Sequence, residues 1–314
     1  EAEKTADQGL RMCIRALDYL PPVDANFGEY LRAIITADSD LVPDDRLHYR
    51  TAFAEAFAKR GIRVEGQAFS STETLCWEAP EPFADTDDPT KTAEASFHEI
   101  LGDLQLGMTF GSVPSSSDGE GAASASTQRE QRSADDSAIA TQRFSGAEAY
   151  EHKAGKRNLR DLAMVVVRSN QAKMHRWLDL DGPFDREWEK LLGVRFKYDP
   201  ALQTIRRKKA AQGEKPSQDL TFEVQSVRIS RRTSPDGETL HQLIVQVVQS
   251  RRAFFDPAKQ TAADRGEDQG EPDFIFRGGA TLIVDLRDGR VTRVIRKRID
   301  DDRRLRQMRA FKLG

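Results

Sequence analysis

Apolar residues recur at helical spacing through the first 62 residues of the chain. Residues 3–20 are expected to form a helix, which Pro21-Pro22 would end because proline cannot continue the helical hydrogen-bond pattern. The apolar positions of this segment fall at i, i+3, i+4 and i+7, and they are Leu10, Cys13, Ile14 and Leu17. This spacing predicts a single buried stripe along the helix.

Two more helices are expected before residue 62. The first should run over about 25–37, with Asp24 as its N-cap, and the second over about 45–60. Gly61 then suits the left-handed position that commonly follows a helix. Because the connections are short, these helices should be neighbours in space and form an N-terminal bundle.

The composition of the chain changes twice in its middle. Residues 66–111 combine proline-bearing loop sequence with a short amphipathic helix over about 93–104. Residues 112–142 are mostly small or polar, so they cannot bury enough apolar surface to offset the entropy of ordering them. We therefore expect a helical domain over 1–65, a mixed connector over 66–111, a disordered low-complexity loop over 112–142 and an α+β domain over 143–314.

From residue 220 onward the apolar spacing changes from helical to alternating. Strands are expected over about 220–229 and 240–249, with a turn at 234–237 between them. The alternation switches parity within the first of these strands, which predicts a β-bulge near Gln225-Ser226. Together these segments predict a long antiparallel hairpin.

A second hairpin is expected nearer the C-terminus. Strands over about 281–286 and 291–296 flank Asp288-Gly289, the strongest hairpin signal of the chain. Gly278-Gly279 separates the first of them from another short strand over 274–277 and predicts a bulge or tight turn. With a final helix over about 300–311, the predicted fold is α+β: an N-terminal helical bundle, then an antiparallel sheet with a closing C-terminal helix.

Composition narrows the classes of partner. Charged residues make up 32% of the 314 residues, and the net charge is −3, which argues against extensive binding to a nucleic-acid backbone. The longest apolar run, residues 163–167, is far shorter than the roughly 20 residues that span a bilayer, so no membrane insertion is expected. Cys13 and Cys76 provide no disulfide framework and are expected to be small buried side chains. Together with the lack of a leader sequence, this favours an intracellular location.

One histidine stands in a sequence that resembles the start of a zinc-binding helix. Residues 98–102 read HEILG, with Gly102 where a zinc peptidase carries its second histidine. Zinc capture on a helix needs two imidazoles one turn apart, with the glutamate beside them as the base. A partly exposed histidine on a short amphipathic helix is therefore the expected role of His98.

Four aspartates lie close together in the sequence: Asp38, Asp40, Asp44 and Asp45. A calcium site would need six to eight oxygen ligands and usually a glycine that allows the loop to turn, and this segment has no glycine. Capping of the helix that begins near residue 45 is the favoured interpretation, because a carboxylate complements the helix dipole.

Basic residues are concentrated at the end of the chain: Arg293, Arg296, Lys297, Arg298, Arg303, Arg304, Arg306, Arg309 and Lys312. A nucleic-acid groove would also need aromatic side chains for stacking, and only Phe311 is available there. A solvent-exposed helix with i,i+4 ion pairs is the favoured interpretation. No nucleophile elbow and no phosphate-binding loop occurs, so the sequence predicts no catalytic, cofactor-binding or metal-ligating residue within the chain.

Several segments nevertheless resemble a known family. Residues 33–38 (AIITAD) and 56–62 (AFAKRGI) resemble the closing helices of fungalysin- and thermolysin-like zinc metallopeptidases. Residues 12–19, followed by two prolines, look like large bacterial proteins of this gluzincin type. The C-terminal extension of those proteins also resembles residues 222–228 and 273–279.

The resemblance implies an active site that these residues do not contain. In such peptidases the HExxH helix and the remaining zinc ligand precede the closing helices, so any zinc is expected in an upstream half. The chain would then be the non-catalytic C-terminal portion of a peptidase-like protein, with the upstream peptidase domain as its partner. The alternative is a non-catalytic binding or scaffolding protein that holds a protein or peptide partner through its antiparallel sheet.

Overall fold

A computed structural model describes residues 2–66, 71–80, 93–104, 106, 159–179, 185–208, 217–234, 237 and 239–314. The chain divides into two compact units, one made of residues 1–102 and 171–314 and the other of residues 103–170. The larger unit carries the features discussed below. The predicted low-complexity loop, 112–142, lies outside the described residues. The segment boundaries expected from composition therefore stay predictions.

The N-terminal segment forms the expected helices. Helix α1 covers Ala2–Ala16 and continues as a single 3-10 turn, η1, over Leu17–Tyr19. Helix α2 covers Phe27–Leu41, and α3 covers Tyr49–Lys59. The N-cap of α2 is Asn26, which forms a capping box with Glu29. The prediction of Asp24 as the cap was wrong, because the two residues that follow it are not yet helical.

The C-terminal segment forms one antiparallel sheet with strand order β1-β2-β3-β4. The strands are β1 (Glu223–Thr233), β2 (Thr239–Ala253), β3 (Phe274–Asp285) and β4 (Val291–Lys297). The predicted bulge is confirmed, since the register of β1 against β2 shifts between Val224 and Ser226. The predicted hairpin at Asp288-Gly289 is confirmed as well, because β3 and β4 pair on either side of it.

Strand β3 differs from the prediction at Gly278-Gly279, which lies inside one continuous strand. A Cβ atom at Gly279 would approach the backbone oxygen of Val247 to 2.0 Å, and one at Gly278 would approach the backbone nitrogen of Ile299 to 2.5 Å. The two glycines therefore allow neighbouring backbone segments to pack closely against β3, rather than interrupting it.

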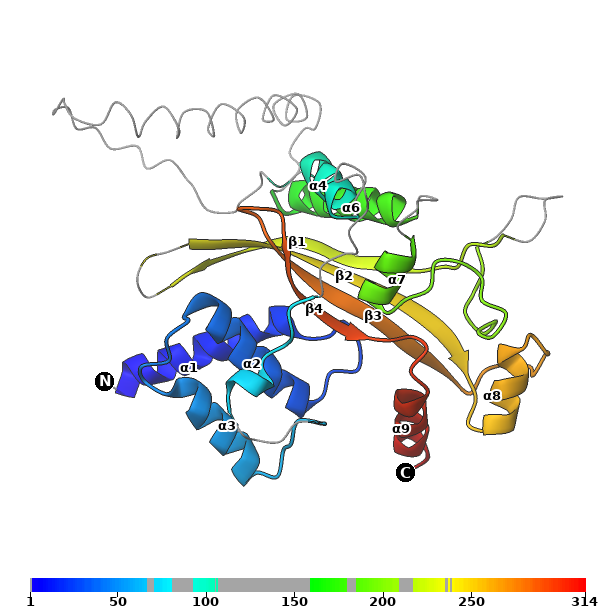
Figure 1. The fold of residues 1–314 in the computed structure, drawn as a ribbon, viewed down its shortest axis with the longest axis horizontal. Coiled ribbons are helices and arrows are strands. Elements are labelled where there is room, and N and C mark those ends of the chain that lie inside the picture. Colours follow the sequence, from blue (N-terminus) through cyan, green and yellow to red (C-terminus); the bar gives the residue numbers. More distant parts are fainter. Residues whose placement is uncertain are drawn as a thin grey trace. The chain divides into compact units, whose positions relative to one another are not determined.

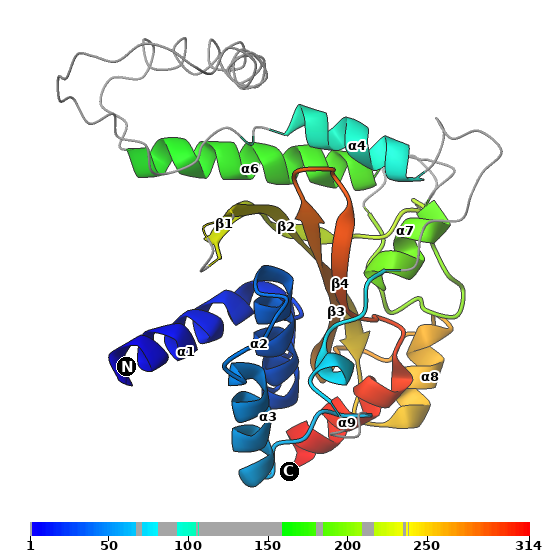
Figure 2. The same cartoon turned by 60° about the vertical axis from the view of Figure 1, so that its left-hand side comes forward.

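Helices cover both faces of the sheet (Figures 1 and 2). Helices α1–α3 lie on one face. Helix α4 (Ala93–Asp103), the last turns of α6 (Leu159–Leu178) and α7 (Asp185–Leu192) lie on the other. Helices α8 (Pro257–Asp264) and α9 (Asp302–Leu313) stand where β2 ends and β3 begins. This arrangement confirms the predicted α+β architecture with a closing C-terminal helix.

Each face of the sheet packs against its own set of buried side chains. Toward α1 and α2, Ile283 and Ile295 pack with fully buried helix residues, which are Met12, Ala16, Tyr19, Ala33, Ile34 and Ala37. On the other face, the rings of Phe97, Trp177 and Trp188 lie 5.0–5.6 Å apart, centre to centre. Among the described residues, no helix is both long and apolar enough to cross a lipid bilayer.

Replacing Gly279 by alanine should destabilise the protein by at least about 3 kcal/mol, because the new methyl group would overlap backbone rather than a flexible side chain. Gly9, in α1, is a matched control, since a methyl group added there would have no atom within 4 Å. Its replacement by alanine should stabilise the protein by about 0.5–1 kcal/mol. Urea denaturation of both variants measures the difference, and equal effects would contradict the close packing at β3.

Candidate functional site

The face of the sheet that meets α1 and α2 is lined with polar side chains. Seven of them bond directly to the N-terminal helices or to their connecting loop: Arg228, Ser230, Arg232, Gln242, Thr281, Arg293 and Lys297. In an exposed sheet these positions would face water. Here the helices cover them, so each polar group needs a partner inside the protein.

Carboxylates from the helical segment supply most of those partners. The Arg232 guanidinium lies 2.7 Å from the Asp18 carboxylate, which also binds Arg228. At the opposite edge of the sheet, on β4, the ammonium group of Lys297 lies 2.9 Å from the Glu29 carboxylate. We call this set of ion pairs between the first 65 residues and the rest of the chain the helix–sheet junction. It includes the pair of Asp40 and Arg293, the pair of Asp24 and Arg304 and the pair of Glu65 and Arg303.

Tyr19 lies at the centre of the junction and is fully buried. Its hydroxyl donates to the Asp40 carboxylate at 2.9 Å and accepts from the Gln242 amide at 3.0 Å. Burial, and then the nearby Asp40 carboxylate, raises the pKa of Tyr19 well above its usual value. The Arg293 guanidinium binds Asp40 at 2.7 Å and donates to the backbone oxygen of Trp77 at 3.0 Å. Tyr19 therefore keeps its proton near neutral pH, and its hydroxyl links α2 to β2 through Asp40 and Gln242.

The four aspartates of residues 38–45 do not share one site, and each has its own partner. Asp40 belongs to the junction, while Asp44 pairs with Arg46 in solvent. Asp45 accepts hydrogen bonds from the first two backbone amides of α3, which confirms the predicted capping role. Asp38 lies 3.3 Å from Arg50, inside the bundle. Within the described residues, no three histidine, cysteine or acidic side chains come together as a metal site would need.

The histidine of the HEILG sequence has a structural contact. Nε2 of His98 lies 2.9 Å from the backbone oxygen of Asp288, in the β3–β4 turn. The ring also packs where a side chain at Gly289 would otherwise stand. His98 therefore connects α4 to the second hairpin. Cys13 and Cys76, expected to be buried, are both free and only partly buried.

Two basic residues near the end of the chain form ion pairs with distant parts of the sequence in place of the expected i,i+4 pairs. Arg303 and Arg304 contact Glu65 and Asp24 of the N-terminal segment, so the prediction of i,i+4 pairing was wrong for them. The buried guanidinium of Arg309 donates to the backbone oxygen of Phe254 at 2.7 Å. Their partners lie far away in the sequence, so local spacing gave no signal for these contacts.

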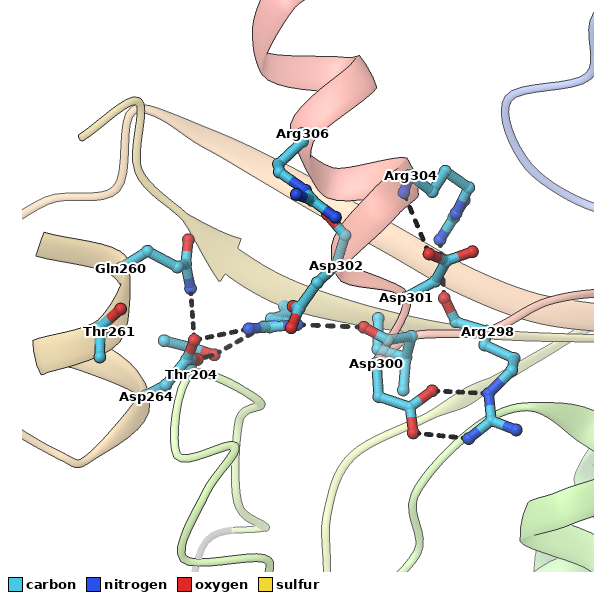
Figure 3. A network of polar contacts seen from close by, with 12 residues as sticks. Thr204, Gln260, Thr261, Asp264, Arg298, Asp300, Asp301, Asp302, Arg304 and Arg306 are labelled. Carbon is cyan, nitrogen blue, oxygen red and sulfur yellow. Dashed lines mark hydrogen bonds and ion pairs between the residues drawn. The ribbon is translucent and has the colours of Figure 1, made fainter. Parts of the chain in front are cut away.

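A second polar network fixes α8 and α9 to the sheet (Figure 3). The carboxylate of Asp264 lies between Gln260 and Thr204, and it also binds the buried Arg251 at 2.5 Å. Beyond it, Asp300 forms two hydrogen bonds of 2.8–2.9 Å with Arg298 (Figure 3). These carboxylates neutralise cations of the same network, so the network serves to position the two helices.

Helix α1 presents a second apolar side to solvent. Leu10, Ile14 and Leu17 are 59%, 58% and 55% exposed, which shows that the predicted buried stripe was wrong. The helix instead buries Met12 and Ala16 against the sheet. Because α1 is apolar on both sides and the sheet can cover only one, its outer side remains uncovered.

No family model, no curated protein and no solved structure matches this chain. The candidate functional features are therefore taken from the contacts and the exposed surfaces of the structure itself. They are the helix–sheet junction, which positions α1, and the outer face of that helix, which we define as Leu10, Ile14 and Leu17. The junction residues were missed in the sequence because alternation along a strand predicts which side chains share a face, but not what covers that face.

Replacing Arg293 by methionine should cost about 2 kcal/mol of stability, because it leaves the Asp40 carboxylate, which is only 14% exposed, without its cation. Arg46→Met is the matched control, since it removes an exposed pair of similar length, 2.8 Å between Arg46 and Asp44. The control should change the free energy of unfolding by less than about 0.5 kcal/mol. Denaturant unfolding monitored by circular dichroism distinguishes the two, and a small effect of Arg293→Met would contradict the role of the junction.

Burial raises the pKa of Asp38 to about 6, although Arg50 acts in the opposite direction. A carboxyl whose pKa is raised on folding favours the native state only while it is protonated, so this contribution is lost as the pH rises from about 4 to about 6. The free energy of unfolding of the wild-type protein, measured relative to that of Asp38→Asn, should therefore fall as the pH rises over that range. Thermal unfolding of both proteins at several pH values measures it, with Asp44→Asn as the surface control. A constant difference between the native protein and Asp38→Asn would contradict the assignment.

Proposed function

We propose that this chain is the non-catalytic C-terminal portion of a zinc metallopeptidase-like protein, in which it supports a catalytic part that precedes it on the polypeptide. The observation that carries the proposal is the uncovered outer face of α1, on a helix whose other side is fixed to the sheet. The resemblance of residues 33–38 and 56–62 to the closing helices of such peptidases, and of residues 12–19 to large bacterial proteins of this type, suggests the identity of the partner.

Energetics favour a covering partner for this face. Burying one leucine or isoleucine side chain contributes about 1.5–3 kcal/mol, and Leu10, Ile14 and Leu17 lie on one side of the helix at i, i+4 and i+7. The junction holds α1 in place before any partner binds, which lowers the entropy cost of association. In this proposal the zinc ion and its ligands belong to the preceding part, and no residue of this chain takes part in the chemistry.

The alternative, a scaffolding protein that binds a peptide along its sheet, has less support. Among the described residues, the outer side of β1 is not paired with another strand. Two side chains nevertheless already bond to backbone oxygens of β1: Gln171 to that of Gln225 at 2.5 Å, and Arg15 to that of Thr233 at 3.5 Å. An added strand would have to displace such contacts, so the outer face of α1 is the better-supported contact surface.

The proposal predicts a native polypeptide that extends upstream of these 314 residues, and the test compares that longer polypeptide with the 314-residue chain. The longer protein should bind zinc and cleave casein, and a chelator should abolish the cleavage. The double substitution Leu10→Ser, Ile14→Ser should reduce cleavage and lower the melting temperature of the longer protein, because it removes contacts between its two parts. The same substitutions should leave the stability of the 314-residue chain almost unchanged, since these residues are exposed there.

Phe311→Ser is the matched control, because Phe311 is also a large exposed apolar side chain but lies on α9. It should affect neither protein. A longer protein without zinc and without proteolysis would contradict the peptidase proposal. Equal effects of the α1 and α9 substitutions would contradict the assignment of the contact surface.

A further inference from the structure

Three arginines converge between the end of α1 and strand β1. Arg228 and Arg232 lie on the same face of β1, four residues apart, and both bind Asp18. Arg15 comes from the last turn of α1, and its backbone oxygen accepts a hydrogen bond of 3.4 Å from Arg232. The ring of Tyr19 lies 4.9 Å from the Arg232 guanidinium and helps to fix it in place.

The charges of this cluster do not balance. Asp18 is the carboxylate that bonds to it, and its oxygens already accept from Arg228, from Arg232 and from the hydroxyl of Ser230 at 3.1 Å. Burial acts to raise the pKa of Asp18, but the hydrogen bonds from the two arginines outweigh it, so that pKa lies below its usual value. One ionised carboxylate against three guanidinium groups leaves an excess of positive charge.

Neighbouring acids do not remove that excess. The carboxylate of Asp38 also attracts Arg15 electrostatically. However, Asp38 already forms an ion pair with Arg50, at 3.3 Å. Burial, and then the neighbouring Arg232, lowers the pKa of Arg15. The two guanidinium groups therefore repel each other in a partly desolvated space.

Two N–H donors of the cluster also lack an acceptor. Nη1 of Arg15 and Nη1 of Arg232 are both buried and have no hydrogen-bond partner among the described residues. The Arg232 side chain is only 4% exposed, so water in bulk solvent cannot serve it. A buried donor without an acceptor costs about 1–3 kcal/mol, and more when the donor is charged.

We propose that Arg15, Arg228 and Arg232 form a binding site for a small oxyanion of the phosphate type. Such an anion has several acceptor oxygens, so it supplies the acceptors that the orphan donors lack, and its negative charge opposes the repulsion between Arg15 and Arg232. Arg228 is 38% exposed, so the cluster is open to solvent at its position. The hydroxyl of Ser226, 3.0 Å from Arg228, adds a polar group at this entrance. The evidence for this site does not depend on the peptidase proposal.

Titration of the full 314-residue chain with inorganic phosphate tests the site. At constant ionic strength, phosphate should raise the melting temperature in a saturable manner, with a dissociation constant on the order of 1 mM by calorimetry. Arg228→Gln should weaken phosphate binding by about tenfold, because it removes one positive charge at the exposed side of the cluster. Arg231→Gln is the matched control, since Arg231 is exposed, adjacent on β1 and outside the cluster.

Circular dichroism and the melting temperature without phosphate establish that each variant is folded, and Arg15→Gln provides a second test should Arg228→Gln fail to fold. Equal loss of phosphate affinity in Arg228→Gln and Arg231→Gln would show a general charge effect and overturn the site. So would a melting temperature that responds to phosphate and to sodium chloride alike, or one that does not respond to phosphate at all.

Discussion

The arrangement of this protein depends on ion pairs that join its first 65 residues to its sheet. Buried carboxylates and guanidinium groups are costly to desolvate, and the cost is offset only when each charge meets its partner in good geometry. Asp18, Glu29 and Asp40 each meet a cation of β1 or β4 at 2.7–2.9 Å. These contacts tolerate little sliding, so they determine how α1 and α2 lie on the sheet and which side of α1 faces outward.

Local sequence patterns predicted the elements well and their burial less well. Alternation located the bulge after Val224, and the Asp288-Gly289 turn signal located the second hairpin, because both features depend on neighbouring residues. Helix α1 shows the limit of such patterns. Its sequence carries one apolar side around Ile14 and another around Met12, and periodicity alone ranks the side with the larger residues first. In the structure the opposite side is buried, since Met12 and Ala16 pack with Ile283 and Ile295 of the sheet.

The junction itself lay beyond any local argument. Asp40 and Arg293 are 253 residues apart in the chain, and neither has a neighbour in the sequence that reveals the other. A basic C-terminal segment is usually solvated, which holds for Arg303 at 70% exposure but not for Arg304 at 12%. The signal that was present is subtler: polar residues recur between the apolar ones of β1 and β4, and the acidic residues of the helices flank buried apolar ones.

The proposed anion site and the outer face of α1 use neighbouring residues of the chain. Arg15 and Asp18 bond to the sheet from the end of α1, while Ile14 and Leu17, beside them in the chain, point to solvent. An anion that neutralises Arg15 would strengthen the attachment of this end of α1, since any ligand that binds the native state alone stabilises it. Better attachment presents the outer face in a fixed orientation, which lowers the entropy lost when a partner covers it. Anion binding and partner binding should therefore reinforce each other by equal factors, because thermodynamic linkage is reciprocal.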